Sequence, residues 1–337
     1  MKKVIEHFNH LFQMIAEHQN IYSDIHICTD NRYMIRCNGV LENYDLAISP
    51  SKEDIIDFCH YYFPQVNLET LNKTGSIDAE FSFNNDMLRG RANIFKDRAG
   101  ISVVIRILKN KIPTEKELRI PLSLQKTKNL SHGLVVISGA TGSGKSTTLA
   151  SIIEGINQTQ SKRIITIEDP IEYLHHWDKS VISQREVGKD TPTFYEGLRS
   201  ALRQDPDIIM VGEMRDQDTV ATALRAAQTG HLVFSTLHTA TTLEAINRII
   251  EFFPSSAHDQ IRSEIAYSFK AFVAQQLIMT KQNKRYAAFE VLLNTEAVAN
   301  LIRKGEIYQI PLYMDSNLGM IKMEDSIQGL RNIGLID

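Results

Sequence analysis

The sequence is short of cysteine. Cys28, Cys37 and Cys59 are the only three among 337 residues, and no two of them are spaced as C-x-x-C. A zinc site is therefore not expected, and unpaired thiols near the start of the chain fit a reducing compartment. We interpret all three as small apolar side chains that are buried in the fold.

Long apolar runs and a surplus of basic charge are missing as well. No stretch approaches the roughly 18 consecutive apolar residues of a membrane-spanning helix, and residues 1–7 become polar too early for a signal peptide. We therefore expect a cytoplasmic protein. The formal net charge of −3 gives no general attraction to nucleic acid or to anionic lipid, so a nucleic-acid partner is not expected.

What the sequence does contain is one glycine-rich stretch with a specific pattern. Residues 139–146 match G-x-x-x-x-G-K-[ST], the phosphate-binding loop. Apolar residues 134–138 predict a buried strand before it, and apolar side chains at helical spacing within 147–157 predict a helix after it. The residues expected to contact the nucleotide are Gly139, Ala140, Thr141, Gly142, Ser143, Gly144, Lys145, Ser146 and Thr147.

The residue types in this loop suit ATP and Mg²⁺. Glycines let successive backbone N–H groups turn toward phosphate oxygens, and the N-terminus of the following helix adds partial positive charge. Lys145 is expected to reach the β- and γ-phosphates, while the hydroxyl of Ser146 is expected to bind Mg²⁺.

The first part of the chain, residues 1–108, predicts a small α+β domain. Apolar side chains recur at helical spacing from Val4 to Ile15, and Ser51 is placed to cap a second helix that Pro64 ends. Alternating stretches predict strands at 23–28, 33–37, 75–83, 89–95 and 101–108, with a tight turn at Asn38–Gly39.

Arginines collect on these predicted strands. Arg91 and Arg106 belong to two different strands. They are either solvated side chains of a sheet surface or groups that face a nucleotide across a domain or subunit boundary. The residues alone leave both interpretations open.

A second domain is predicted over residues 122–337, after a linker at 109–121 that holds two prolines. Its alternation of strands and helices indicates a parallel sheet covered on both faces. Glu168 and Glu213 follow two of its apolar strands, at the end of the sheet where ligands bind. Gly212 occupies the position at which the Mg²⁺-side Asp of this kind of NTPase usually stands.

Two histidines bracket a third apolar strand of this domain. His231 precedes the strand and His238 follows it. A lone histidine at such a place is usually structural, whereas two of them around a strand in an NTPase core leave a γ-phosphate sensor equally open.

Four motifs together resemble the secretion ATPase superfamily of type II secretion systems and type IV pili. These are the phosphate loop, an aspartate box at 164–173, an atypical acidic motif at 198–216 that accounts for Gly212, and a histidine box at 229–239. Further stretches of the family's kind occur at 184–188, 23–27 and 91–95, so the resemblance covers nearly the whole chain.

Within this superfamily the chain is most similar to the retraction branch of type IV pilus ATPases. It shows no extra N-terminal domain and lacks a four-cysteine zinc insertion, and residues 297–304 resemble the branch signature A-I-R-N-L-I-R-E. Ala299 and Lys304 depart from that signature, where they replace an arginine and a glutamate. A divergent retraction ATPase, of the bundle-forming pilus kind, is the nearest match.

The resemblance implies a fold and a motor function. The fold is α/β, a RecA-like P-loop NTPase core with a mostly parallel sheet, preceded by a smaller PAS-like α+β domain. The function is that of a homohexameric ring that hydrolyses ATP at subunit interfaces. Closure of the small domain on the core would pass a movement to a platform protein of the inner membrane, and so to a pilus. That platform would hold the ring at the membrane's inner face.

The same resemblance implies roles for individual residues. Glu168 orients or activates the attacking water, and Ser146 and Glu213 serve Mg²⁺, directly or through water. The two arginines act as fingers that reach the nucleotide from the small domain, and the two histidines report loss of the γ-phosphate. The residues implied to be catalytic are Glu168, Glu213, Arg91, Arg106, His231 and His238.

Other functions share parts of this pattern. An ATPase that assembles a competence or conjugative pilus, or a type II secretion pseudopilus, would have the same core, and the sequence does not fix the direction of movement. A nucleic-acid translocase would need basic or aromatic loops that face a channel. A nucleotide-binding subunit without turnover would be expected to lose acids such as Glu168 and Glu213, which are present.

Overall fold

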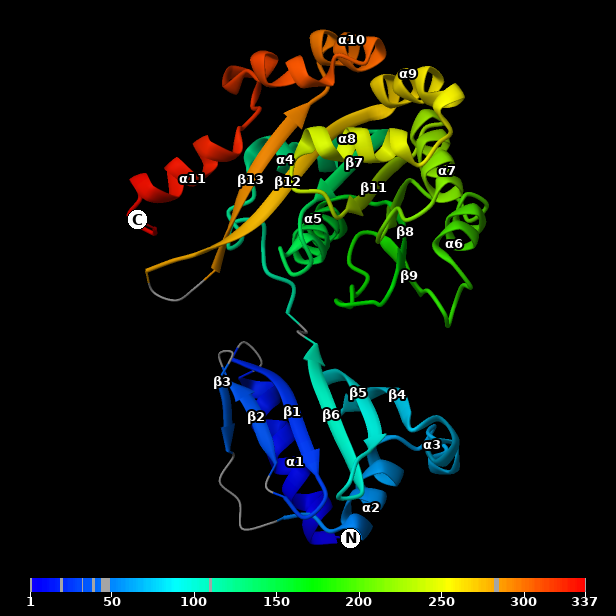
Figure 1. Ribbon diagram of the computed structural model, residues 1–337, viewed down its shortest axis with the longest axis vertical. Helices are drawn as coiled ribbons and strands as arrows, with labels where there is room; N and C mark the ends of the chain where they lie inside the picture. The colour runs from blue at the N-terminus through cyan, green and yellow to red at the C-terminus, as the bar shows by residue number, and fades with distance from the viewer. Residues whose placement is uncertain are drawn as a thin grey trace. The chain divides into compact units, whose positions relative to one another are not determined.

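The chain, seen as a computed structural model, contains two compact units, Met1–Lys111 and Ile112–Asp337, each with its own sheet (Figure 1). The structure describes residues 2–18, 21–31, 33–37, 40–43, 49–108, 111–281 and 285–336. The predicted turn at Asn38–Gly39 lies outside them. None of the helices described is long and apolar enough to cross a membrane.

The first unit is a six-stranded antiparallel sheet with helices, which confirms the predicted small α+β domain. Its strand order is β3-β2-β1-β6-β5-β4. The strands are β1 (Tyr22–Cys28), β2 (Met34–Cys37), β3 (Val40–Asn43), β4 (Ser76–Phe83), β5 (Leu88–Lys96) and β6 (Ile101–Leu108). The helices are α1 (Lys2–Glu17), α2 (Lys52–Tyr62) and α3 (Leu68–Thr74), of which α3 was not predicted.

Local sequence explains why α2 begins and ends where it does. Ser51 is the N-cap, and with Asp54 it forms a reciprocal capping box that satisfies free N–H groups of the first turn. The helix stops just before Pro64, as predicted. Phe58 on its buried face packs edge-on against Phe8 of α1, so aromatic rings meet inside a core that also contains many aliphatic side chains.

The second unit is a seven-stranded, mostly parallel sheet, which confirms the predicted α/β core. Its order is β13-β12-β7-β11-β10-β8-β9, and only β13 runs antiparallel to its neighbour. The strands are β7 (Gly133–Ser138), β8 (Arg163–Glu168), β9 (Val181–Glu186), β10 (Ile208–Val211), β11 (Leu232–Leu237), β12 (Phe269–Met279) and β13 (Arg285–Leu293).

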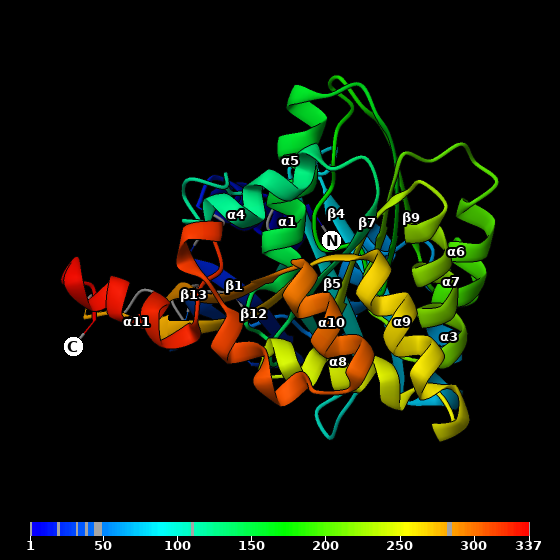
Figure 2. The same cartoon turned by 90° about the horizontal axis from the view of Figure 1, so that it is seen from above.

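Helices cover both faces of this sheet. They are α4 (Leu122–Gln125), α5 (Lys145–Thr159), α6 (Phe194–Ala201), α7 (Gln217–Gln228), α8 (Thr242–Glu251), α9 (His258–Ser268), α10 (Glu296–Lys304) and α11 (Met323–Asn332). Short 3-10 turns are η1 (Lys126–Asn129), η2 (Ser255–Ala257), η3 (Ile307–Tyr313) and η4 (Ser316–Leu318). Figure 2 shows α5 and α8–α10 on opposite sides of the sheet.

Alternate side chains of β7 explain this two-sided covering. Leu134 and Val136 pack in the core shared with α6 to α9, whereas Val135 and Ile137 pack in the core shared with α5. A strand buried on both faces is apolar throughout, and β7 is fully buried along its length. Because β7, β8, β10 and β11 are parallel neighbours, the segments that follow them emerge at one edge of the sheet.

Candidate nucleotide-binding site

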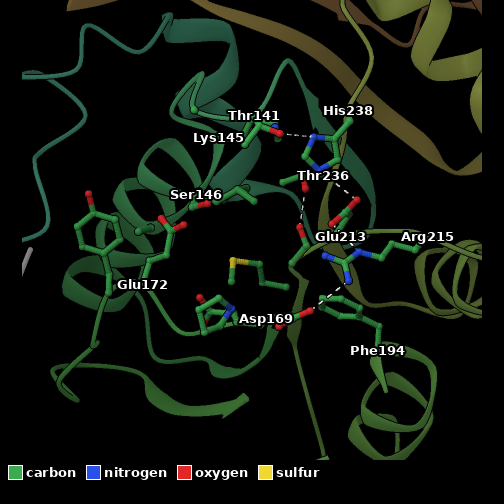
Figure 3. A pocket seen from close by; sticks show the side chains of 18 of the residues that line it. Thr141, Lys145, Ser146, Asp169, Glu172, Phe194, Glu213, Arg215, Thr236 and His238 are labelled. Atoms are coloured by element: carbon green, nitrogen blue, oxygen red, sulfur yellow. Dashed lines mark hydrogen bonds and ion pairs between the residues drawn. The ribbon is translucent and has the colours of Figure 1, made fainter. Parts of the chain in front are cut away.

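A cavity of about 370 Å³ opens at this edge of the second unit, where the four strands end (Figure 3). The phosphate loop and α5 form one wall, and the segments after β8, β10 and β11 form the others. Its charged and titratable lining residues are Lys145, Glu168, Asp169, Glu172, Tyr173, His175, Glu213, Arg215 and His238. The structure therefore brings the phosphate loop and the predicted strand-end acids to one cavity.

Glycine is required in the phosphate loop for steric reasons. Gly139 has φ +151°, and a Cβ there would stand 2.3 Å from the carbonyl oxygen of Gln275 on β12. Gly144, at φ +89°, is the N-cap of α5 and offers no side chain to cap the helix. The N–H groups of the first turn of α5 are therefore left for an outside acceptor, which is the arrangement that binds phosphate.

Lys145 lies at the first position of α5, two residues earlier than the predicted helix. Its side chain is buried, and Nζ donates to the carbonyl oxygens of Gly139 (2.7 Å) and Ala140 (3.1 Å). Burial lowers the pKa of Lys145, and the carboxylates of Glu213 and Glu172 oppose that effect. The ammonium group therefore lies inside the loop, hydrogen-bonded to backbone carbonyls. Phosphate oxygens of a bound nucleotide could replace these carbonyls as its hydrogen-bond acceptors.

Of the nine predicted nucleotide contacts, the cavity is lined by Thr141, Gly142, Lys145 and Ser146. Thr147 is not a lining residue, and its hydroxyl lies 3.0 Å from the hydroxyl of Tyr173, which does line the cavity. Ser143 is buried, and its carbonyl accepts a hydrogen bond from Gln275. These residues shape the loop, and contact with nucleotide through their backbones stays a prediction.

Glu168 ends β8 and reaches the cavity, partly buried. Its Oε1 accepts hydrogen bonds from the Thr166 hydroxyl (2.6 Å) and from the side-chain amide of Gln184 (3.1 Å). Burial raises the pKa of Glu168, and those two hydrogen bonds and nearby His175 act in the opposite direction. A carboxylate with a raised pKa at a ligand cavity has the character of a general base.

Glu213 lies after β10 at the centre of a chain of charged groups. His238 Nε2 is 3.1 Å from its Oε1, and Arg215 Nε is 2.7 Å from its Oε2. Arg215 also forms an ion pair with Asp169, with 3.1 Å between its Nη1 and Asp169 Oδ2 (Figure 3). Its guanidinium lies over the ring of Phe194. Sequence reasoning missed Arg215 as a site residue, although it stands inside the acidic motif.

The donors at this site fit Mg²⁺ as the partner of a nucleotide. Ser146 and Glu213 both line the cavity, one with a hydroxyl and one with a carboxylate. Mg²⁺ takes oxygen ligands and usually keeps several waters besides one or two carboxylates and substrate phosphates. In the part of the chain that the structure describes, no group of three or more His, Cys, Asp or Glu side chains is arranged to hold a metal ion by itself.

The two predicted histidines lie at opposite ends of β11. His238 lines the cavity, with Nδ1 3.5 Å from the Thr141 hydroxyl. His231 precedes the six-residue strand, and its Nδ1 is 3.1 Å from the carbonyl of Ala226. A strand of that length spans roughly 20 Å. The geometry therefore gives no support to His231 as a γ-phosphate sensor of its own chain, because parallel strands carry only one end to the ligand edge.

Arg91 and Arg106 face each other across β5 and β6 of the first unit. Both are exposed, and the Nε of Arg106 donates to Asp24 on the next strand over 3.1 Å. Their register puts both side chains on the same face of the sheet, so the two arginines lie next to each other. Their role as fingers stays a prediction.

Comparison with known proteins identifies relatives of the whole chain. A family model described as type II/IV secretion system protein matches residues 73–322. An uncharacterised protein of Escherichia coli K12, YggR, is 40% identical over 309 residues, which cover 91% of this chain and 93% of the relative. The type IV pilus retraction ATPase PilT of Pseudomonas aeruginosa is 38% identical over 319 residues, or 93% and 91% of the two chains.

A solved structure agrees with these matches. The crystal structure titled as the pilus retraction motor PilT with bound ADP superposes with a TM-score of 0.87, at 38% identity, and covers 97% of this chain and 94% of that one. Both units of the chain thus have counterparts in a protein that was crystallised with a nucleotide.

Proposed function

The chain belongs to the type II/IV secretion system protein family, and from this membership and the site we propose that it is an ATPase that drives retraction of a type IV pilus. One observation carries the proposal. Lys145 of the phosphate loop and the acids Glu168 and Glu213 converge on one cavity. They do so in a chain that matches a retraction ATPase over nine tenths of both lengths.

The reaction is the hydrolysis of ATP to ADP and phosphate. A water oxygen attacks the γ-phosphorus, and the bond between that phosphorus and the β–γ bridging oxygen breaks. A general base takes a proton from the attacking water. Amides of the loop and Lys145 hold the phosphates. Ser146 and Glu213 would hold Mg²⁺, which neutralises phosphate charge when bound. Phosphoryl transfer depends on this positioning and charge more than on covalent help.

We infer that Glu168 orients the attacking water and takes its proton. Its Oε1 is occupied by Thr166 and Gln184. Within the described residues, Oε2 has no hydrogen-bond partner, so that oxygen is left for water. The raised pKa of Glu168 makes its carboxylate a stronger base than an exposed one.

The groups around Glu213 form a path from the phosphate loop to the far wall of the cavity. Thr141 of the loop contacts His238, His238 contacts Glu213, and Glu213 contacts Arg215. Loss of the γ-phosphate changes the charge that these side chains face. We infer that His238 and Arg215 rearrange at that step.

The working unit is a homohexameric ring at the inner face of the cytoplasmic membrane, bound to a pilus platform protein and not to nucleic acid. In this ring Arg91 and Arg106 of a small domain would supply positive charge to a nucleotide at a subunit boundary, as arginine fingers do. The relatives named as type IV pilus ATPases support a role at a pilus, while the ring, the platform and the arginine fingers rest on the family resemblance.

Phosphate release by the purified chain tests the ATPase. Among the described residues that line the cavity, Lys145 carries the one ammonium, so Lys145→Ala should lower the rate by at least about 100-fold while folding is kept. Single-stranded DNA should leave the wild-type rate unchanged. A Lys145→Ala protein that hydrolyses ATP normally would contradict the site, and a strong stimulation by DNA would favour the translocase instead.

A further inference from the structure

Gln184, in the middle of β9, lies beside the carboxylate of Glu168, and both the nitrogen and the oxygen of its side-chain amide form hydrogen bonds. Its Nε2 donates to Glu168 Oε1 (3.1 Å) and to the carbonyl of Tyr173 (2.8 Å). Its Oε1 accepts from the backbone N–H of His175 (2.8 Å). The opposite orientation of the amide would set oxygen against two acceptors and nitrogen against a donor, so this network fixes which atom faces Glu168.

The segment that Gln184 holds is itself attached to α5, the helix that follows the phosphate loop. His175 Nδ1 lies 2.8 Å from Glu154 Oε2 of α5, with the imidazole almost fully buried. Asn157, one turn further along α5, donates to the carbonyl of His176 over 2.7 Å. Gln184 therefore links Glu168 on β8 directly to the segment after β8, and through that segment it is connected to α5.

We propose that Gln184 is a positioning residue for ATP hydrolysis, which fixes the carboxylate of Glu168 so that Oε2 faces the attacking water. The proposal rests on the proposed role of Glu168. Two donors on Oε1, Thr166 and Gln184, leave the carboxylate little freedom to rotate. A group placed in this way saves reorganisation during the reaction, and that is the main source of rate in phosphoryl transfer.

Gln184→Glu is the most informative substitution. A glutamate keeps an oxygen to accept from the His175 N–H, but it loses both donors and sets a carboxylate against that of Glu168. We expect kcat for ATP to fall on the order of 10- to 100-fold, with KM and the affinity for a fluorescent ADP analogue within about twofold. Gln328→Glu makes the same change on the exposed face of α11 and should be silent.

A double mutant shows whether Gln184 acts through Glu168. In a Glu168→Gln background, Gln184→Glu should reduce the residual rate no further, because the group that it positions is already gone. An equal fold loss in both backgrounds, or a Gln184→Glu enzyme with normal kcat, would overturn the proposal. Gln184→Met, which adds no charge, gives the same readouts if the glutamate variant does not fold.

Failure of the proposed function gives a different result. A wild-type ring without ATP turnover would remove the premise that Glu168 is the base. A wild-type ring that turns over normally while Gln184→Glu does too would leave the ATPase intact and reject the positioning role alone.

Discussion

At the residue scale, Glu168 lowers the stability of the fold by the same burial that suits it to act as a base. Burial raises the pKa of this carboxyl above its ordinary value. The folded protein then binds its proton more tightly than the unfolded chain does, so stability is lost as the pH rises from the ordinary value of 4.5 through the raised one. At neutral pH the ionised Glu168 therefore costs stability.

Replacing this carboxylate should make the unit more stable and inactive. Glu168→Gln keeps an oxygen for Thr166 and Gln184, so its Tm at neutral pH should rise by a few degrees, at about 2–4 °C per kcal/mol for a domain of this size. The gain should shrink as the pH approaches 4.5. Calorimetry at two pH values measures both effects. A lower Tm at neutral pH would show that burial of Glu168 is not destabilising.

How much of the site the sequence predicted depends on how local each feature is. The phosphate loop is contiguous, so its pattern predicts both its chemistry and its place at the end of a strand. Glu168 and Glu213 follow apolar strands, and parallel topology brings them together. The role of Gln184 depends on contacts between β8, β9 and the loop after β8, which no single stretch contains. His231 does not line this cavity, and the sequence around it could not show that, because a histidine beside a strand can stand at either end.

At the element scale, β12 holds the phosphate loop to α5. Gln275, buried in the strand, donates to the carbonyl of Ser143 (2.7 Å) and accepts from the hydroxyl of Thr148 (2.9 Å). Its backbone carbonyl oxygen also lies so close to Gly139 that a side chain would not fit there. One strand residue thus fixes both the loop and the first turn of the helix, and nucleotide binding depends on that shape.

Removing this buried amide should loosen the nucleotide site. Gln275→Leu leaves the Ser143 carbonyl and the Thr148 hydroxyl without their partner, which should lower the free energy of unfolding by about 2 kcal/mol. The affinity for an ADP analogue should fall with it. Gln276→Leu is the matched control, because Gln276 is exposed on the other face of the strand, and it should change stability by less than about 0.5 kcal/mol. Equal effects of the two substitutions would contradict the role of Gln275.

Elements were predictable where their pattern is strong. The apolar runs of β7, β8, β10 and β11 stand out in the sequence because these strands are buried on both faces. β9 and β13 mix buried with partly exposed positions and carry no such signal. On α10, Ala299 is buried in the main core. A guanidinium at that position would lose its hydration, which explains why the departure from the family signature suits this fold.

At the scale of the whole molecule, the arginine prediction concerns the assembled ring. If Arg91 acts on a neighbour's nucleotide, a subunit with Arg91→Ala and a subunit with Lys145→Ala should complement each other, because one brings an intact loop and the other an intact arginine. An equal mixture should recover about a quarter of the wild-type ATPase rate. No recovery in mixed rings would mean that Arg91 acts within its own chain. A normal rate in rings made of Arg91→Ala subunits alone would mean that Arg91 has no part in hydrolysis.

The sequence predicts two domains but not how they work together. Each unit has its own apolar core, and periodicity in the sequence reports cores. The proposed assembly into a ring and the direction of movement would depend on surfaces that contact other chains. Those surfaces leave no periodic pattern in one sequence, so the family resemblance alone indicated them.

Pilus dynamics in living cells test the central claim, that ATP hydrolysis in this cavity drives retraction. The native chain is replaced by Glu213→Ala, which removes a carboxylate from the cavity and leaves the phosphate loop intact. Fluorescently labelled pili are then followed over time. The account predicts long, abundant fibres that extend but do not retract. Cells without pili would make the chain an assembly motor, and normal retraction would contradict the account outright.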